Sequence, residues 1–316
     1  VPSIFHYFKE AGYKTGLAGK THTPTGWFDE DIDFLADAFG YEVPRTYYRN
    51  KMAEGVQGLS LNVYSLDLAR EGLMEDRDDK IYHEWYEAHH HDAGQGLDAR
   101  YSRLDEDHTV EAWTAGKTID FIEAYQDNPF IFWMSVPRPH QTYVPAKKFW
   151  DMYDEDRLTL PPNADDPMEG RHPMARRQLY SFKESTDWMS FETKTYNRAR
   201  RRVLRGYYAN VTQVDDAFGR VLNRLEELGL RENTIVLYLT DHGEFAGEHG
   251  LIEKAPGIAF HCVTHIPTII SYPKALAQNV RREGLAESVD WFKTLCDLCA
   301  IPVPSHVMGQ SLFPLL

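Results

Sequence analysis

The sequence has few cysteines, no long apolar run and a shortage of basic residues. Its three cysteines, Cys262, Cys296 and Cys299, are too few for a disulfide framework. No stretch approaches the roughly 18 to 20 consecutive apolar residues of a membrane-spanning helix, so no membrane span is expected. Lys and Arg total 34 against 48 Asp and Glu, a net charge of −14. A surface this acidic is poorly suited to neutralising phosphates, so we expect no nucleic-acid partner.

What the chain does contain is typical of a globular protein. Its 316 residues are 42% hydrophobic and 26% charged, which suits one large domain or two modest ones. Cys296 and Cys299 form a C-x-x-C within an apolar helical pattern, and we expect the cysteines to be buried or partly buried thiols rather than metal or redox groups. Residues 1–10 lack a basic start followed by an apolar run. The compartment stays open, because any signal peptide would lie upstream of this chain.

Helical spacing and short apolar runs alternate along the chain. Apolar residues recur three or four apart at 4–11, 109–125, 203–228 and 286–300, while strand-like runs occupy 15–18, 130–136, 234–240 and 265–272. The runs at 130–136 and 234–240 lack polar alternation, which predicts strands buried on both faces. The alternation predicts an α/β fold with a mainly parallel sheet flanked by helices.

Two polar segments, 27–107 and 154–196, show no sustained period. We expect both to be irregular excursions from a single large α/β domain over residues 1–316. Three consecutive histidines lie in the first excursion, and a solvated surface explains them better than metal binding. Three histidines in and near the segment after Asp241 are expected to form structural hydrogen bonds: His249, His261 and His265. For His261, the alternative is a place at a substrate mouth.

Polar and charged side chains begin where the apolar runs stop. Ligands of such sheets bind beyond the carboxyl ends of the strands, so these residues are expected to meet at one edge: Lys20, His22, His140, Asp241, His242 and Lys254. Taken singly, each has an ordinary explanation as a solvated lysine, a packed histidine or a turn-forming aspartate. Their joint placement after successive strands favours a site.

The residue types suit an anionic tetrahedral group held on a metal. Asp241 offers a hard oxygen and His242 an imidazole nitrogen to a divalent cation. Lysines at Lys20 and Lys254 would neutralise a sulfate or phosphate ester, and histidines move protons near neutral pH.

Five segments carry motifs of one known family. Residues 12–22 read GYKTGLAGKTH, 139–145 read PHQTYVP, 207–216 read YYANVTQVDD, 233–254 run from NTIV through DHGE to GLIEK, and 309–312 read GQSL. Together they resemble the sulfatase family, which belongs with the alkaline-phosphatase-like hydrolases. The resemblance spans nearly the whole chain and is interrupted by the two excursions.

The resemblance implies a role for each matching residue. Asp241 and His242 would bind a divalent metal, with Ca²⁺ expected and Mn²⁺ or Zn²⁺ as alternatives, since His242 departs from the Asn of many animal sulfatases. Lys20 and Lys254 would contact oxygens of the transferred group. His140 with Lys254 would protonate the leaving alcohol, and His22 would take a proton from the nucleophile's second hydroxyl.

One family motif has no counterpart here. Sulfatases carry C-x-P-S-R, or a Ser variant, whose first residue becomes the formylglycine nucleophile, and no Cys or Ser of this chain fits that pattern. We therefore expect the nucleophile, and most of a smaller C-terminal subdomain, to lie outside this chain. The expected function is hydrolysis of a sulfate monoester of a sugar or small organic alcohol. The alternatives are a phosphonate monoester or phosphodiester hydrolase and a noncatalytic fragment, and the oligomeric state is open.

Overall fold

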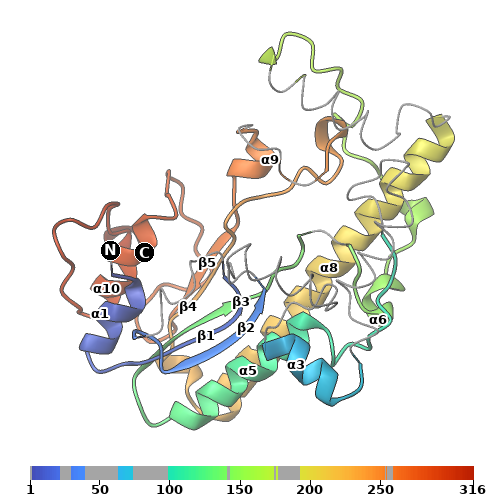
Figure 1. The fold of residues 1–316 in the computed structure, drawn as a ribbon. Helices are drawn as coiled ribbons and strands as arrows, with labels where there is room; N and C mark the ends of the chain where they lie inside the picture. Colours follow the sequence, from blue (N-terminus) through green and yellow to red (C-terminus); the bar gives the residue numbers. More distant parts are fainter. Residues whose placement is uncertain are drawn as a thin grey trace, which may run out of the picture.

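The computed structural model describes residues 2–21, 30–39, 63–73, 99–140, 143–173, 176, 193–252, 254 and 259–316. Figure 1 shows strands at the centre of the molecule with helices on both sides of them. The helices are α1 (Ile4–Glu10), α3 (Val63–Arg70), α5 (Val110–Tyr125), α6 (Lys147–Trp150), α8 (Thr193–Glu227), α9 (His261–Thr264) and α10 (Asp290–Leu298). The strands are β1 (Lys14–Lys20), β2 (Phe34–Phe39), β3 (Phe130–Ser135), β4 (Val236–Leu239) and β5 (Thr268–Ser271).

Three of the strands form a parallel sheet in the order β2-β1-β3. Gly16 of β1 is in register with Phe34 on one side and Phe132 on the other. The chain returns from β2 to β3 through α5, as a parallel connection requires. β4 and β5 pair antiparallel in a second, two-stranded sheet. This arrangement confirms the predicted α/β class with helices flanking a parallel sheet.

The two faces of the parallel sheet pack against different helices. Leu17 of β1 packs with Phe5 of α1 and Ile131 of β3, and Ile131 also contacts the cluster around Cys296 of α10. On the opposite face, Phe132 packs with Phe121 of α5 in a cluster that includes residues of α8. Alternate side chains of each strand therefore enter different cores, as the pleat dictates.

Gly16 allows the second face to close. A Cβ at this position would lie 2.5 Å from Phe132 Cδ2 and 2.8 Å from Phe121 Cδ2, nearer than real Cβ contacts. The two rings, with centroids 4.7 Å apart, occupy the space that any larger residue would need. Gly16, which lies inside the G-Y-x-T-x-x-x-G pattern, is therefore needed for packing.

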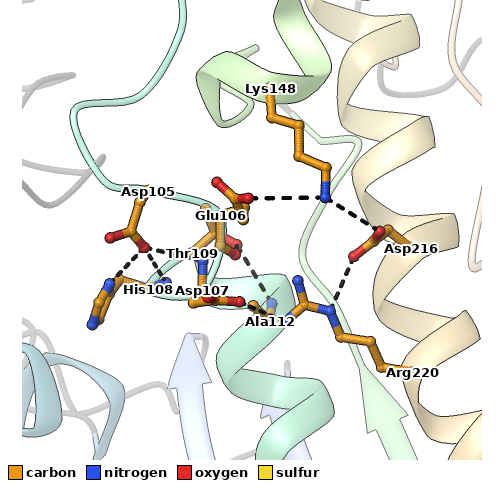
Figure 2. Close-up of polar contacts among 9 residues, drawn as sticks. All are labelled: Asp105, Glu106, Asp107, His108, Thr109, Ala112, Lys148, Asp216 and Arg220. Carbon is orange, nitrogen blue, oxygen red and sulfur yellow. Dashed lines mark hydrogen bonds and ion pairs between the residues drawn. The ribbon is translucent and has the colours of Figure 1, made fainter.

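Figure 2 shows the polar contacts where α5 begins. The Thr109 hydroxyl accepts a hydrogen bond from the third residue after it and caps the helix. Arg220 of α8 donates to Asp107 at 2.8 Å and to Asp216 at 3.0 Å, and Lys148 of α6 lies 3.8 Å from Asp216. Exposed ion pairs of this kind contribute about 0 to 1 kcal/mol each. Packing between α5 and α8, rather than these pairs, holds the two helices together.

The helix expectations are confirmed with shifted ends. The helix expected at 109–125 is α5 with Thr109 as its cap, and the helix expected at 286–300 is the shorter α10. The stripe at 203–228 belongs to α8, which begins ten residues earlier, within the second excursion. In the rest of that excursion, the described residues 154–172 contain a 3₁₀ turn at Glu155–Arg157, and Pro173 and Arg176 are helical.

The first excursion was expected to be irregular, and this is wrong in two places. Residues 34–39 form β2, which pairs with β1, and residues 63–70 form α3, which packs on β2. Each element is short, so too few apolar residues repeat for a period to emerge. His89, His90 and His91 lie outside the described residues.

The expectation that 130–136 and 234–240 form strands buried on both faces is also wrong. Trp133 of β3 is 45% exposed and Leu239 of β4 is 36% exposed. Among the described residues, β3 is the last strand of its sheet and β4 pairs with one strand, β5. An apolar run indicates a strand, but the number of faces that are covered depends on neighbours that the run does not encode.

Candidate active site

The ends of β1, β3 and β4 carry most of the residues that the sequence singled out. Lys20 is the last residue of β1, His140 lies in the turn that follows β3, and Asp241 follows β4. β1 and β3 are parallel neighbours, so their carboxyl ends lie at one edge of the sheet. The topology therefore places Lys20 and the His140 turn on the side where ligands of such sheets bind.

Lys20 is half-buried and lies in the electrostatic field of two other candidate residues. Burial lowers the pKa of the Lys20 ammonium, the positive charge of Lys254 lowers it further, and the carboxylate of Asp241 opposes both. Three candidate residues, one at the end of β1 and two in the segment after β4, thus influence one another. Two ammonium groups in a partly desolvated position create a local positive potential suited to an anion.

Lys254 also contacts His140. Its Nζ atom lies 3.0 Å from His140 Nε2, although 114 residues separate the two in sequence. An ammonium can only donate, so His140 Nε2 accepts and the neutral ring carries its proton on Nδ1. Lys254 Nζ and His140 Nε2 therefore share one proton, and Lys254 lies within electrostatic range of Lys20.

Asp241 and His242 have the donor chemistry of cation ligands. His242 Nδ1 donates to the carbonyl oxygen of Gly243 at 2.7 Å, which leaves the lone pair of Nε2 available. That Nε2 atom lies 3.7 Å from Oδ1 of Asp241, whose side chain is largely exposed. Two donors this close can reach one divalent ion at bond lengths of about 2.0 to 2.5 Å.

The two residues fit a divalent metal in chemistry but supply only part of a coordination shell. Within the described residues, no group of three or more His, Cys, Asp or Glu side chains could hold a metal ion. Gly243 allows the chain after them to lie close to Cys262, because a Cβ there would lie 2.0 Å from the carbonyl oxygen of Cys262. The Gly243 N–H donates to Val263 O at 2.7 Å and fixes the loop against α9.

The loop from Glu244 to Lys254 is anchored by packing. Phe245 and Leu251 are fully buried against Met168 of the second excursion. Ile252, two residues before Lys254, packs with Tyr143, which follows His140. These contacts link both members of the His140–Lys254 pair to one core.

His249 is a structural residue, as expected. Its Nδ1 donates to Asp166 Oδ2 at 2.7 Å, and Asn163 Nδ2 donates to its Nε2 at 3.2 Å. The residue adopts a left-handed φ of 54°, uncommon for a side chain of this size. The hydrogen bond from His249 also helps to lower the pKa of Asp166, after the bond from the Met168 N–H. Through Asn163 and Asp166, the second excursion is therefore hydrogen-bonded to the loop that leads to Lys254.

The structure does not describe every expected site residue. His22 lies outside the described residues. His261 and His265 are exposed on α9 and just after it, with ring centroids 4.5 Å apart.

The three cysteines are free thiols. Cys296 is buried and Cys262 and Cys299 are half-buried, which confirms the expectation of buried or partly buried thiols.

Sequence reasoning missed two further residues beside the site. The Tyr143 hydroxyl donates to Glu244 Oε1 at 3.4 Å, and burial followed by the Glu244 charge raises the pKa of the nearby Tyr207. Tyr143 lies within the PHQTYVP motif and Glu244 within DHGE, so membership of these motifs could have indicated both residues.

Comparison with known proteins defines the class. The family model described as Sulfatase matches residues 1–301, so the chain belongs to the sulfatase family. It is 29% identical over 250 residues to an N-acetylglucosamine-6-O-sulfatase of Bacteroides thetaiotaomicron, covering 63% of this chain and 44% of the relative. It is 25% identical to a choline-sulfatase of Rhizobium meliloti, covering 100% of this chain and 56% of the relative. The chain spans about half the length of these curated relatives.

Solved structures show the same fold. The chain aligns with a phosphonate monoester hydrolase of Silicibacter pomeroyi at a TM-score of 0.68 and 21% identity, covering 100% of this chain and 61% of that one. It aligns with a protein solved in complex with its substrate D-glucosamine-2-N,6-O-disulfate at a TM-score of 0.67 and 21% identity, covering 99% and 64%. These matches confirm the alkaline-phosphatase-like α/β core. No described helix combines the length and apolar character needed to cross a membrane.

Proposed function

We propose that the protein hydrolyses a sulfate monoester of a saccharide or small organic alcohol. The observation that carries this proposal is the contact between Lys254 and His140, with Lys20 and Asp241 in electrostatic range. Positive charge and a proton-bearing pair at one sheet edge suit a reaction in which an anionic ester gains charge on its leaving oxygen.

Each residue has a distinct task in this proposal. Lys20 and Lys254 hold the oxygens of the sulfate group as point charges. The His140–Lys254 pair delivers a proton to the leaving alcohol oxygen, so that the alcohol departs neutral. His22 takes the proton from the second hydroxyl of the nucleophile, a role that follows from its place in the G-K-x-H motif.

Asp241 and His242 would hold the divalent cation. When bound, the cation polarises the ester and adds positive charge beside the sulfate oxygens. We propose Ca²⁺, with Mn²⁺ and Zn²⁺ as the alternatives that the imidazole nitrogen of His242 favours. Elemental analysis of the purified full-length protein distinguishes the three ions, and Asp241→Asn should lower the bound amount.

The nucleophile in this proposal is a formylglycine contributed by sequence outside these 316 residues. Determining the reading frame upstream of Val1 tests this directly. A C-x-P-S-R or S-x-P-S-R motif there supports the proposal, and a start codon near Val1 supports a noncatalytic role instead.

The substrate class is tested by activity. The relatives named as N-acetylglucosamine-6-O-sulfatase and choline-sulfatase support sulfated saccharides and small alcohols as substrates. The full-length protein, coexpressed with a formylglycine-generating enzyme, is assayed for sulfate release from a panel of aryl, sugar and choline sulfates. Lys274, an exposed lysine that donates a hydrogen bond to Asn233, provides the control. Sulfate release that is lost in Lys254→Ala but retained in Lys274→Ala supports the proposal.

Phosphonate monoester or phosphodiester hydrolysis is the second candidate. His242 as a nitrogen ligand favours it, because Mn²⁺ and Zn²⁺ accept nitrogen more readily than Ca²⁺ does. Sulfate and phosphonate esters share tetrahedral shape and negative charge, so both are included in the panel. Cleavage of phosphonate esters without any sulfate release overturns the first proposal in favour of the second.

A further inference from the structure

A buried polar network lies beside the turn that carries His140. Its four members come from three elements: Glu111 of α5, Arg138 of the turn after β3, and Asn210 and Gln213 of α8. All four are at least nine-tenths buried, and Glu111 is 1% exposed. Buried charges are uncommon unless they are paired and hydrogen-bonded, so a network of this kind calls for an explanation.

Arg138 is the centre of the network. Its Nη1 atom donates to the carbonyl oxygen of Val144 at 2.7 Å and to Asn210 Oδ1 at 3.2 Å, and its Nε lies 3.6 Å from Glu111 Oε1. The guanidinium therefore joins the two ends of the segment that contains His140, from residue 138 to residue 144. The planar guanidinium holds several acceptors in fixed directions, whereas the three N–H donors of a lysine rotate and fix no such arrangement.

Gln213 attaches the same segment to the helices at a second point. Its Oε1 accepts from the Ala146 N–H at 2.7 Å, and its Nε2 donates to Glu111 Oε2. Asn210 and Gln213 lie three residues apart on α8 and so share one helix face. The segment is thus attached to α5 and α8 on both sides of His140, while the His140 ring contacts Lys254.

We propose that Arg138 is a positioning residue that holds His140 at its distance from Lys254, with Glu111, Asn210 and Gln213 fixing the orientation of the guanidinium. This inference rests on the proposed ester hydrolysis. A proton donor misplaced by about 1 Å can reduce a rate by about 10²-fold. The network keeps His140 in place without touching the substrate itself.

The test separates positioning from a general effect on stability. Arg138→Lys keeps the positive charge beside Glu111 but loses the fork, so the buried pair stays balanced. The double variant Arg138→Met with Glu111→Gln removes both charges, and replacing both members of a buried pair is often nearly neutral for stability. Both variants should fold, and both should lower kcat by about 10²-fold with a small change in KM.

A surface ion pair between the same two helices, α5 and α8, provides a matched control. Arg224 of α8 pairs with Glu123 of α5 at 2.7 Å on the surface. Arg224→Lys should leave kcat, KM and the His140 signals as in the unsubstituted protein. A kcat retained within about 3-fold in Arg138→Lys or in the double variant overturns the proposal.

A second readout does not depend on activity. Nitrogen-15 spectra of the histidine-labelled full-length protein report the His140 ring, assigned by the loss of its signals in His140→Gln. In Arg138→Lys we expect these signals to shift or broaden, whereas Arg224→Lys leaves them in place. If the unsubstituted protein cleaves no ester, the proposed function fails, and the His140 spectra alone decide the positioning: unchanged signals in Arg138→Lys refute it.

Discussion

Substitution of Asp290 should weaken the attachment of the C-terminal segment by a measurable amount. Asp290 begins α10 and is 8% exposed. Its Oδ1 accepts from the Gln310 N–H at 2.8 Å and its Oδ2 from the Glu287 N–H at 2.9 Å. Thr294, one turn later, accepts from the Leu312 N–H at 2.8 Å. These contacts show what holds the G-Q-S-L motif in place.

The magnitude follows from the two bonds to the charged carboxylate. Each hydrogen bond to a charged group contributes about 1.5 kcal/mol at the lower end of its range, so Asp290→Ala should lower the free energy of unfolding by about 3 kcal/mol at pH 7. Asp290→Asn keeps one acceptor and should lose about half as much.

The effect should depend on pH in a known direction. The Gln310 N–H and then the Glu287 N–H hold the pKa of Asp290 below its usual value of 3.8. A carboxyl whose pKa is lowered on folding contributes its stability above the unfolded pKa and loses it as pH falls through the folded pKa. The difference between the unsubstituted protein and Asp290→Ala should be full at pH 6 to 7 and shrink below about pH 4.

Urea denaturation of the full-length protein at pH 7, 5 and 3.5 measures this difference. A loss below about 1 kcal/mol for Asp290→Ala at pH 7 would refute the reasoning, because a single neutral hydrogen bond could account for it. A loss that grows as the pH falls would refute the assigned direction of the pKa shift.

Three further outcomes are expected. Gly16→Ala should destabilise the fold by about 1 to 3 kcal/mol in urea denaturation, because its Cβ overlaps Phe132, and equal stability would contradict this packing. His249→Ala should lower the free energy of unfolding by about 1.5 to 3 kcal/mol, because the hydrogen bond to Asp166 is lost. The same substitution in an Asp166→Ala background should have a much smaller effect, and an equal effect would contradict the assignment to this bond. Lys254→Ala should lower kcat/KM by about 10²- to 10³-fold in the sulfate-release assay, and retained activity would remove this lysine from the mechanism.

Several elements followed from local pattern alone. Apolar spacing predicts helices over 109–125 and 203–228, and α5 and α8 confirm both. The short elements β2 and α3 were missed, because a run of six to eight residues carries too few repeats to establish a period. The burial of β3 was overestimated, because a continuous apolar run does not show that its strand is the last of the sheet among the described residues.

The site was predicted as a set of residues rather than as a geometry. Motif and topology placed Lys20, His140 and Asp241 after strand ends and Lys254 in the loop that follows Asp241, and the structure brings His140 and Lys254 into contact. Neither motif nor spacing indicated Arg138 as a support for His140, since its partners come from helices far along the chain. The roles of these residues in catalysis remain predictions that the variants above test.

The sequence by itself determined the fold class, the family and the types of side chain at each strand end, because these depend on periodicity and on short contiguous motifs. Only the tertiary structure decided which side chains meet. Glu111 and Gln213 are 102 residues apart and His140 and Lys254 are 114 apart, yet both pairs are in contact. Such contacts depend on how helices and strands pack, and packing is a property of the whole chain that no local pattern contains.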